Sequence, residues 1–471
     1  MMDGNREHLE ETFSQFKAKF YRRFPDLSIF NCGEINLLKV VLEGLRVNYS
    51  TKGKVRTFSF YPNFAFRFFL FLKKIFQKEK YKSKISEITL NEFKQHKILI
   101  IDVGRKLRDD DGHLHSVYFE NIINHLAEIP LVIYESSLHQ DSEISFNEIF
   151  NAFIFQNLTN NELILKDQLK KKLIYFKNTH LFSSREFKSV KIAMHLFFLN
   201  FLVWNRFLFY LKDLRVCLLT CHYHKEAQLL ALRFNGIKTV ELQHGLISAK
   251  DIFYVFPESI AKIRHKAMFP DMILTYGNFW TEILRKGYEF SHDNIINFGY
   301  YLFSAKDNFN RKLTELCDLI FSRKVLLITT QPGLSKEIKS YIQFLSDHHK
   351  DDKDKVIVVK PHPRESVESY KSCFSNFFNV LVTELPIDSL LKISNIHLSV
   401  YSSCLYDALR VNVPNFCLDI AKSSDYVTEI VDAGIAIKIQ LDESPFNVSP
   451  QIFTTPAEIF SVPDYSLIAQ F

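Results

Sequence analysis

A histidine at the end of a predicted strand is the first residue whose position suggests chemistry. The stretch IKTVELQ, residues 237–243, reads as a buried strand, and Gln243-His244-Gly245 stands at its end. An imidazole changes charge near neutral pH and can take a proton from a hydroxyl group, so His244 is a candidate general base. Gly245 permits a tight turn or a close approach of a ligand to the main chain, and Gln243 is a candidate contact for an acceptor. An ordinary turn, with His244 bound to a neighbouring carbonyl, is the alternative.

Three nitrogen-bearing side chains follow another apolar strand. Lys360, His362 and Arg364 alternate with two prolines after the stretch KVIVV, residues 355–359. Prolines fix the main-chain φ angle and donate no amide hydrogen bond, so they direct these side chains instead of pairing in a sheet. Such a set suits a phosphate or a nucleotide. A solvated basic turn is the alternative.

Hydroxyl groups and a carboxylate complete the candidate donor site. Ser402 and Ser403 follow the strand predicted at 395–401, and a helix begins directly after them. Groups at a helix N-terminus bind anions with help from the helix dipole, although the same serines could simply cap the helix. Glu429 precedes the last predicted strand, where a carboxylate could accept hydrogen bonds from a ribose. We expect 360–364 and Ser402-Ser403 to come from neighbouring strand ends and to meet at one nucleotide.

A polar loop, residues 104–120, follows the first predicted strand. It contains Arg105, Arg108 and His113, which are candidates for binding a polar acceptor. It also contains three consecutive aspartates, of which Asp110 and Asp111 are further candidates for a catalytic base. A solvated charged loop is an equally reasonable interpretation.

Apolar strand-like stretches alternate with helical stretches twice along the chain. This order predicts an α/β fold with two facing Rossmann-like, doubly wound domains and a cleft between them. We place a helical N-terminal region at residues 1–95, an acceptor-binding domain at 96–304 and a donor-binding domain at 305–471. Strands are predicted at 96–104, 130–136, 215–221, 237–243, 271–277 and 295–302, and then at 324–332, 355–363, 378–384, 395–403, 413–419 and 434–439.

Composition and charge exclude several classes of protein. The 59 Lys and Arg residues against 53 Asp and Glu leave a net charge of +6, which is too mild for a nucleic-acid-binding protein but suits an anionic ligand or membrane surface. The 7 cysteines form no Cys-x-x-Cys pair, so neither a zinc knuckle nor a disulfide framework is indicated. Reduced thiols and an N-terminus without a signal-peptide pattern favour a cytoplasmic protein.

Two apolar stretches raise the question of membrane contact. Residues 194–211 barely reach spanning length and contain Asn200, Asn205 and Arg206, so we expect a buried or half-buried helix. Residues 64–76 end in basic residues and could lie on a membrane surface, although packing on their own domain is favoured. Peripheral contact with the inner face of the plasma membrane therefore stays as an option.

The order of three motifs resembles that of bacterial GT-B glycosyltransferases of surface-polysaccharide (capsule and lipopolysaccharide) biosynthesis. These motifs are Gln243-His244-Gly245, Lys360-Pro361-His362-Pro363 and Tyr401-Ser402-Ser403, within residues 96–440. The second half is similar to sialyltransferases and polysialyltransferases with HP and Ser-Ser motifs. The His-Gly turn and the KxHP-like motif are similar to those of CDP-glycerol polyol-phosphate transferases.

The resemblance implies roles for several residues. His362 and Ser402-Ser403 would hold the donor phosphate, and the first half would bind the acceptor. The base would be His244 by similarity to the polyol-phosphate transferases. By similarity to the sialyltransferases it would be Asp110 or Asp111, within Asp-Asp-Asp-Gly. The two similarities disagree, and the sequence leaves both open.

The expected activity is transfer of a sugar from a nucleotide-sugar donor, with a CMP-linked acidic sugar favoured, to a hydroxyl of a glycan or lipid-linked glycan. No metal or other cofactor is expected, because cationic side chains and hydroxyls would stabilise the departing phosphate. The alternatives are a CDP-glycerol-type polyol-phosphate transferase, a non-hydrolysing sugar-nucleotide 2-epimerase and an inactive glycan-binding scaffold. Asp109–Asp111 also contain the Asp-x-Asp pattern of a metal-dependent GT-A-like enzyme, a rival that leaves the second half unexplained.

Overall fold

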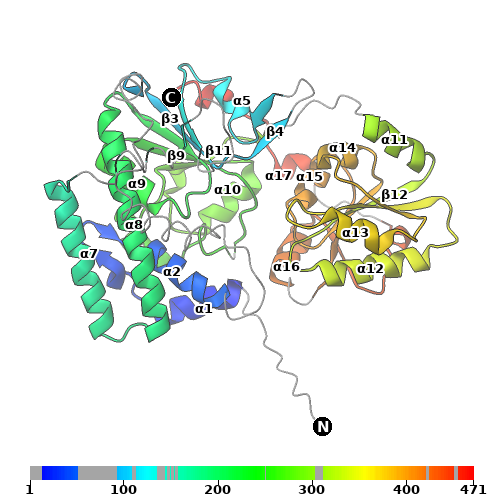
Figure 1. Ribbon diagram of the computed structural model, residues 1–471, viewed down its shortest axis with the longest axis horizontal. Helices are drawn as coiled ribbons and strands as arrows, with labels where there is room; N and C mark the ends of the chain where they lie inside the picture. The colour runs from blue at the N-terminus through cyan, green and yellow to red at the C-terminus, as the bar shows by residue number, and fades with distance from the viewer. Residues whose placement is uncertain are drawn as a thin grey trace, which may run out of the picture.

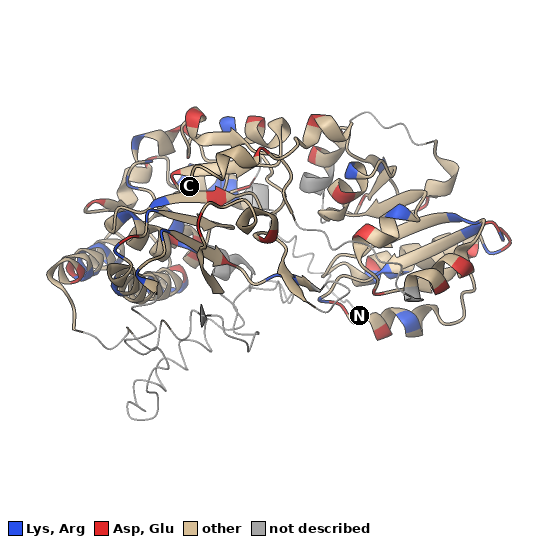
Figure 2. Ribbon diagram, turned by 90° about the horizontal axis from the view of Figure 1, so that it is seen from above, with Lys and Arg blue, Asp and Glu red and all other residues tan. Residues whose placement is uncertain are grey.

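The computed structural model describes residues 13–50, 93–108, 113–134, 144–145, 149, 153, 157–249, 251–302, 311–420, 424–449 and 455–471. These residues form two α/β domains that lie side by side in both views (Figure 1 and Figure 2). The stretch 64–76 and the aspartates 109–111 lie outside the described residues.

A seven-stranded parallel sheet forms the centre of the first domain among the described residues, in the order β11-β10-β9-β8-β3-β6-β7. Counted from β3, the first six strands follow the 3-2-1-4-5-6 order of a doubly wound fold. The strands are β3 (Ile98–Asp102), β6 (Leu131–Tyr134), β7 (Ile144–Ser145), β8 (Val216–Leu219), β9 (Lys238–Leu242), β10 (Met272–Thr275) and β11 (Ile295–Asn297).

The second domain repeats this plan with a six-stranded parallel sheet, β14-β13-β12-β15-β16-β17. Counted from β12, its order is again 3-2-1-4-5-6. The expected fold class is therefore confirmed. The strands are β12 (Lys324–Thr329), β13 (Lys355–Lys360), β14 (Val380–Val382), β15 (Ile396–Ser399), β16 (Asn415–Leu418) and β17 (Ile437–Ile439).

The strands are apolar along most of their length because helices cover both faces of each sheet. All residues of β3, β8, β15 and β16 are buried. The helices are α5 (Glu120–Ile123), α9 (Glu226–Phe234) and α10 (Asn278–Arg285) in the first domain, and α11 (Arg311–Ile320), α12 (Ser335–His348), α13 (Val367–Phe374), α14 (Ile387–Lys392), α15 (Cys404–Arg410) and α16 (Ser424–Asp432) in the second.

The N-terminal helices pack on the first domain (Figure 1). They are α1 (Phe13–Arg23) and α2 (Leu38–Ser50), and α2 lies along the long helix α8 (Ser184–Tyr210). By length and composition α8 could cross a membrane, but half of its most apolar window is buried inside the protein. It packs between α2, α9 and α7 (Asn160–Asn178), in agreement with the half-buried helix expected there.

The C-terminal segment returns from the second domain to the first. Helix α17 (Pro456–Ile459) packs against α10, and the N–H of Ser461 donates to the carbonyl of Tyr276 at 2.9 Å. A Cβ atom at Gly277 would lie 2.0 Å from the carbonyl oxygen of Ile459. Only glycine therefore permits this approach of the two main chains.

Candidate active site

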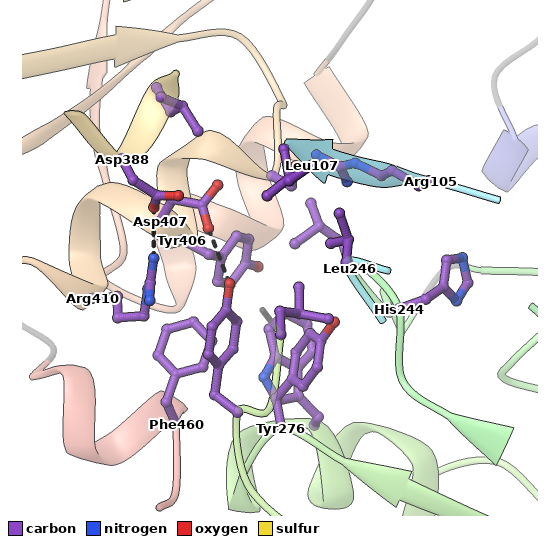
Figure 3. A pocket seen from close by; sticks show the side chains of 17 residues that line it. Arg105, Leu107, His244, Leu246, Tyr276, Asp388, Tyr406, Asp407, Arg410 and Phe460 are labelled. Carbon is purple, nitrogen blue, oxygen red and sulfur yellow. Dashed lines mark hydrogen bonds and ion pairs between the residues drawn. The ribbon is translucent and has the colours of Figure 1, made fainter. Parts of the chain in front are cut away.

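A cavity between the two domains is lined by side chains from both (Figure 3). In Figure 3, Arg105 and His244 lie on the side of the first domain, and Asp388, Asp407 and Arg410 lie on the side of the second. The cavity measures about 100 Å³. The lining residues are Arg105, Leu107, Val117, His244, Gly245, Leu246, Tyr276, Trp280, Tyr300, Leu302, Ile387, Asp388, Ser403, Tyr406, Asp407, Arg410 and Phe460.

His244 stands between two tyrosines at the end of β9. The hydroxyl of Tyr223 lies 3.2 Å from Nε2, and the hydroxyl of Tyr254 lies 3.5 Å from Nδ1. Burial lowers the pKa of His244 to about 4, and the charges of Lys225 and Arg105 act in the same direction. The imidazole is therefore neutral at pH 7, which is the form that can accept a proton.

The glycine after His244 is not required by its main-chain geometry. Gly245 is not among the glycines with positive φ, and no described atom lies within 4 Å of the position that a Cβ would take. Because Gly245 lines the cavity, the missing side chain leaves room on the cavity side. Of the two explanations for this glycine, the structure supports the open approach, because the main-chain conformation at residue 245 does not require glycine.

The loop after β8 was not singled out in the sequence. Cys221 and His224 have φ angles of 59° and 71°, a conformation that costs a non-glycine residue free energy and is concentrated at functional sites. The loop carries Tyr223, and β8 is one of the two strands at the point where the strand order of the first sheet reverses. Ligands of doubly wound folds bind outside such points. This topological signal becomes visible only once the strand order is known.

Asp407 is a second titratable group of the cavity that sequence reasoning missed. It lies on α15, and Tyr300 of the first domain donates a hydrogen bond to its Oδ1 at 3.4 Å. Burial and the neighbouring Asp388 raise the pKa of Asp407 to about 6, although Arg410 and Arg105 oppose the shift. Asp388 is held by Arg410 at 2.8 Å. A carboxyl group that titrates near neutral pH inside a cleft is a candidate acid or base.

The Lys360–Arg364 segment is held by hydrogen bonds that leave one edge of His362 available. The N–H of Arg364 donates to Nδ1 of His362 at 3.1 Å, and the N–H of His362 donates to Thr330 Oγ1 at 2.8 Å. Because Nδ1 accepts, Nε2 carries the proton of a neutral imidazole and can donate to a phosphate. Burial lowers the pKa of His362, and the Arg364 and Arg105 charges add to this effect.

The serines lie at a strand end that does not neighbour the end of β13. Strand β12 separates β13 from β15, so the expectation of adjacent strand ends is wrong. Thr330, at the end of β12, contacts His362, while Ser399 of β15 donates to Thr329 O at 3.0 Å. The β12 end therefore links the two motifs. A βαβ order that places the first strand of the domain in the middle explains the difference.

The paired serines contribute differently to this edge of the sheet. Ser403 is exposed and lines the cavity, whereas Ser402 Oγ accepts a hydrogen bond from the N–H of Cys404 at 3.2 Å. Helix α15 has seven residues, so its dipole contributes little to binding an anion at Ser402 and Ser403. Lys360 lies at the end of β13, where burial lowers its pKa.

The proposed acceptor residues separate into different environments. Residues 104–120 contain an antiparallel hairpin of β4 (Lys106–Arg108) and β5 (Leu114–Ser116). Arg105 at its base lines the cavity, whereas His113, near its tip, is exposed. Arg108 ends β4, and its side chain lies outside the description, as do Asp110 and Asp111.

Gln243 is fully buried beneath the His244 turn. Its Oε1 accepts a hydrogen bond from the N–H of Tyr276 at 2.8 Å, and its Nε2 donates to the Gly245 carbonyl at 2.8 Å. Both ends of the amide are therefore used by the main chain. In this arrangement Gln243 holds the turn and does not face the cavity.

Glu429 connects the two domains. Its carboxylate accepts hydrogen bonds from Ser248 Oγ and from the N–H of Ala249, the latter at 2.7 Å. These partners belong to the loop that follows His244. The carboxylate that we assigned to a ribose is thus occupied by the first domain in this structure.

The chain is a two-domain α/β protein with a GT-B-like fold, and titratable residues from both domains line one cavity. No protein-family model and no curated protein sequence matches the chain. Similar solved structures include a UDP-N-acetylglucosamine 2-epimerase from Neisseria meningitidis bound to UDP-GlcNAc (14% identity, TM-score 0.40, 72% of this chain and 86% of that one). They also include Acinetobacter baumannii MurG (11%, 0.39, 76% and 87%) and the wall teichoic acid polymerase TagF (14%, 0.40, 82% and 87%). Likeness at this level carries no inference about activity.

Proposed function

We propose that the protein is a glycosyltransferase that moves a sugar from a nucleotide-sugar donor to a hydroxyl of a surface glycan. One observation carries the proposal: His244 of the first domain and Asp407 and Ser403 of the second line a single cavity. This arrangement offers a proton acceptor on one side and polar groups on the other. A cavity of about 100 Å³ is smaller than the roughly 300 Å³ of a small-molecule site, so it would hold the reacting end of the donor only.

The second domain would stabilise the departing nucleotide. The Nε2–H of His362 is free to donate to phosphate because its Nδ1 is already engaged by the N–H of Arg364. Lys360 and the Ser402-Ser403 hydroxyls lie on the two sides of the β12 end. Fixed positive and hydroxyl groups of this kind lower the energy of the developing charge without a metal.

The first domain would activate the acceptor hydroxyl. His244 is neutral at pH 7 and lines the cavity, so it is our first choice for the base. Asp407, whose pKa is raised to about 6, is our second choice. Asp110 and Asp111 lie outside the described residues and stay as further candidates. Arg105 would position an anionic or polar acceptor beside either group.

The decisive test pairs nucleotide binding with transfer. A thermal-shift panel of nucleoside mono- and diphosphates should identify one stabilising nucleotide, because the product occupies the same site as the donor. His362→Ala should remove that stabilisation and the transfer activity while the circular dichroism spectrum stays unchanged. His348→Ala, which alters an exposed histidine of the same domain, is the matched control. Full turnover by His362→Ala would end the proposal.

An epimerase is the second candidate function, because two titratable groups from opposite sides of one cavity are also what proton removal and return require. Donor supplied without acceptor separates the two functions. Isomerised sugar nucleotide would identify the epimerase. A donor that stays unchanged by itself, and is consumed once glycan is added, would identify the transferase.

We also propose that the protein works in the cytoplasm at the surface of the inner membrane. The outward face of α7 exposes Leu163, Ile164, Ile174 and Tyr175. Exposed lysines accompany them on the same helix, namely Lys166, Lys170, Lys171 and Lys177. Apolar groups mixed with cations suit a surface of anionic lipid, where a lipid-linked acceptor would be available.

A further inference from the structure

A buried chain of polar side chains lies directly behind His244. The hydroxyl of Tyr254, which is 3.5 Å from His244 Nδ1, donates to Glu241 Oε1 at 2.7 Å. Glu241 Oε2 lies 2.5 Å from Nδ1 of His222, and the main-chain N–H of His222 donates to Oε1 at 3.1 Å. The side chains of Glu241, His222 and Tyr254 are at most 1% exposed, so none of these three residues contacts a substrate directly.

The carboxylate of Glu241 is ionised despite its burial. Burial acts to raise its pKa, but His222 and the Tyr254 hydroxyl outweigh it and hold the pKa below its usual value. A buried amino group lies nearby: Lys39 of α2 is 1% exposed, donates to the Met268 carbonyl at 2.7 Å and lies 3.5 Å from Glu226. Burial lowers the pKa of Lys39, and the negative charges of Glu226 and Glu241 oppose that shift.

The ionised carboxylate of Glu241 fixes the directions of the hydrogen bonds that its neighbours make. A carboxylate only accepts, so the single proton of the Tyr254 hydroxyl points to Glu241. That hydroxyl therefore presents a lone pair to His244, and Nδ1 of His244 must carry the proton. Nε2 is then unprotonated and accepts from the Tyr223 hydroxyl, 3.2 Å away.

We propose that Glu241, acting through Tyr254, sets the tautomer of His244 and leaves Nε2 as its basic atom. Glu241 and Tyr254 are positioning residues, and Tyr223 occupies the place that an acceptor hydroxyl would take. The use of this base in sugar transfer rests on the proposed function, whereas the tautomer does not.

The test reads the tautomer directly. In protein labelled with ¹⁵N-histidine, the signal of His244, assigned by its loss in His244→Gln, should show a protonated Nδ1 and an unprotonated Nε2 at pH 7. In Glu241→Leu the Tyr254 hydroxyl loses its acceptor and its proton can turn toward His244, so the preference for a protonated Nδ1 should be lost. Tyr254→Phe should likewise give a mixture of both tautomers, and it serves if Glu241→Leu fails to fold.

Tyr223→Phe is the matched control, because it removes the contact at Nε2 and leaves Glu241 untouched. It should keep the proton on Nδ1. The proposal would be overturned if His244 of the wild type were protonated on Nε2, or if its tautomer were unchanged in both Glu241→Leu and Tyr254→Phe. Where transfer is measurable, Tyr254→Phe should lower kcat at least tenfold with the donor KM unchanged. If the tautomers of His244 are as expected but no sugar transfer can be detected, that result would contradict the proposed function and leave the tautomer proposal intact.

Discussion

The carboxylate of Glu429 in the second domain accepts a hydrogen bond from the main-chain N–H of Ala249 in the first, at 2.7 Å. Ala249 is five residues beyond His244, and the neighbouring Ser248 donates to the same carboxylate. On its other side this loop is held by Lys17 of α1, which lies 3.3 Å from the Ala249 carbonyl. The position of the His244 loop therefore depends on the approach of the two domains.

Removing this contact should impair closure of the cleft. Hydrogen bonds to a charged group contribute about 1.5–3 kcal/mol, so Glu429→Ala should lower kcat/KM for transfer roughly tenfold or more and increase hydrolysis of the donor by water. Both rates are measured by nucleotide release with and without acceptor. Glu443→Ala, at an exposed site of the same domain, is the control. Equal rates in the two variants would mean that the contact has no part in closure.

The dependence of kcat/KM on pH should decide between the two candidate bases. A base is active only when unprotonated, so the rate falls as the pH drops through its pKa. With His244 as the base, the acidic limb should have its midpoint near pH 4, whereas Asp407 would place it near pH 6. If the midpoint of the acidic limb lies near pH 6, Asp407→Asn should abolish that limb. Circular dichroism at each pH excludes unfolding as the cause.

A buried carboxyl group should make stability depend on pH. Burial raises the pKa of Glu289 to about 8, against the opposing effects of nearby amides and Lys17. Between its ordinary pKa of about 4.5 and 8 the folded state holds one proton more than the unfolded state, so the free energy of unfolding falls as pH rises, by about 1.4 kcal/mol per unit. Glu289→Gln should remove this slope and raise the Tm at pH 7.5 by a few degrees.

The exposed Glu282 of α10 supplies the control for that measurement, since Glu282→Gln should leave the slope of Tm against pH as in the wild type. Equal slopes of Tm against pH in the wild type and in Glu289→Gln would show that Glu289 is ionised in the folded protein.

Two glycines should respond differently to alanine. At Gly277 the new Cβ would meet the Ile459 carbonyl at 2.0 Å and the Phe460 Cα at 3.1 Å. Main-chain atoms cannot rotate away, so Gly277→Ala should cost about 1–3 kcal/mol and lower the Tm. At Gly245 the Cβ meets open space, so Gly245→Ala should keep the wild-type Tm and weaken substrate binding. A wild-type Tm for Gly277→Ala would show that the C-terminal segment can move away from residue 277 at little cost in free energy.

Membrane contact can be measured by flotation with lipid vesicles. The protein should float with vesicles of anionic phosphatidylglycerol and not with neutral phosphatidylcholine, because the attraction is electrostatic. Replacing Leu163, Ile164 and Ile174 by serine should abolish flotation. Replacing the exposed Phe321 of the second domain by serine should not. Flotation that survives the α7 changes would place the contact elsewhere.

The local pattern of the chain determined the two parallel sheets and the positions of several polar groups. Runs such as KVLLIT and KVIVVK are typical of strands buried on both faces. Lys360 ends such a run, and His244, His362 and Ser403 come after such runs, so their place at strand ends could be predicted. The strand order within the sheet, and hence the separation of β13 from β15 by β12, could not be.

The tertiary structure alone decided which groups meet. Tyr223 and Tyr254 reach His244 from different loops. Lys39 of the N-terminal helices lies beside Glu226 of α9, and Asp407 of the other domain lines the same cavity as His244. These contacts join residues far apart in the sequence, and no periodicity records them. The pKa values that distinguish the candidate bases arise from burial and from charges brought near by folding. The physical reason is that desolvation and Coulomb interaction depend on distance in space and not on distance along the chain.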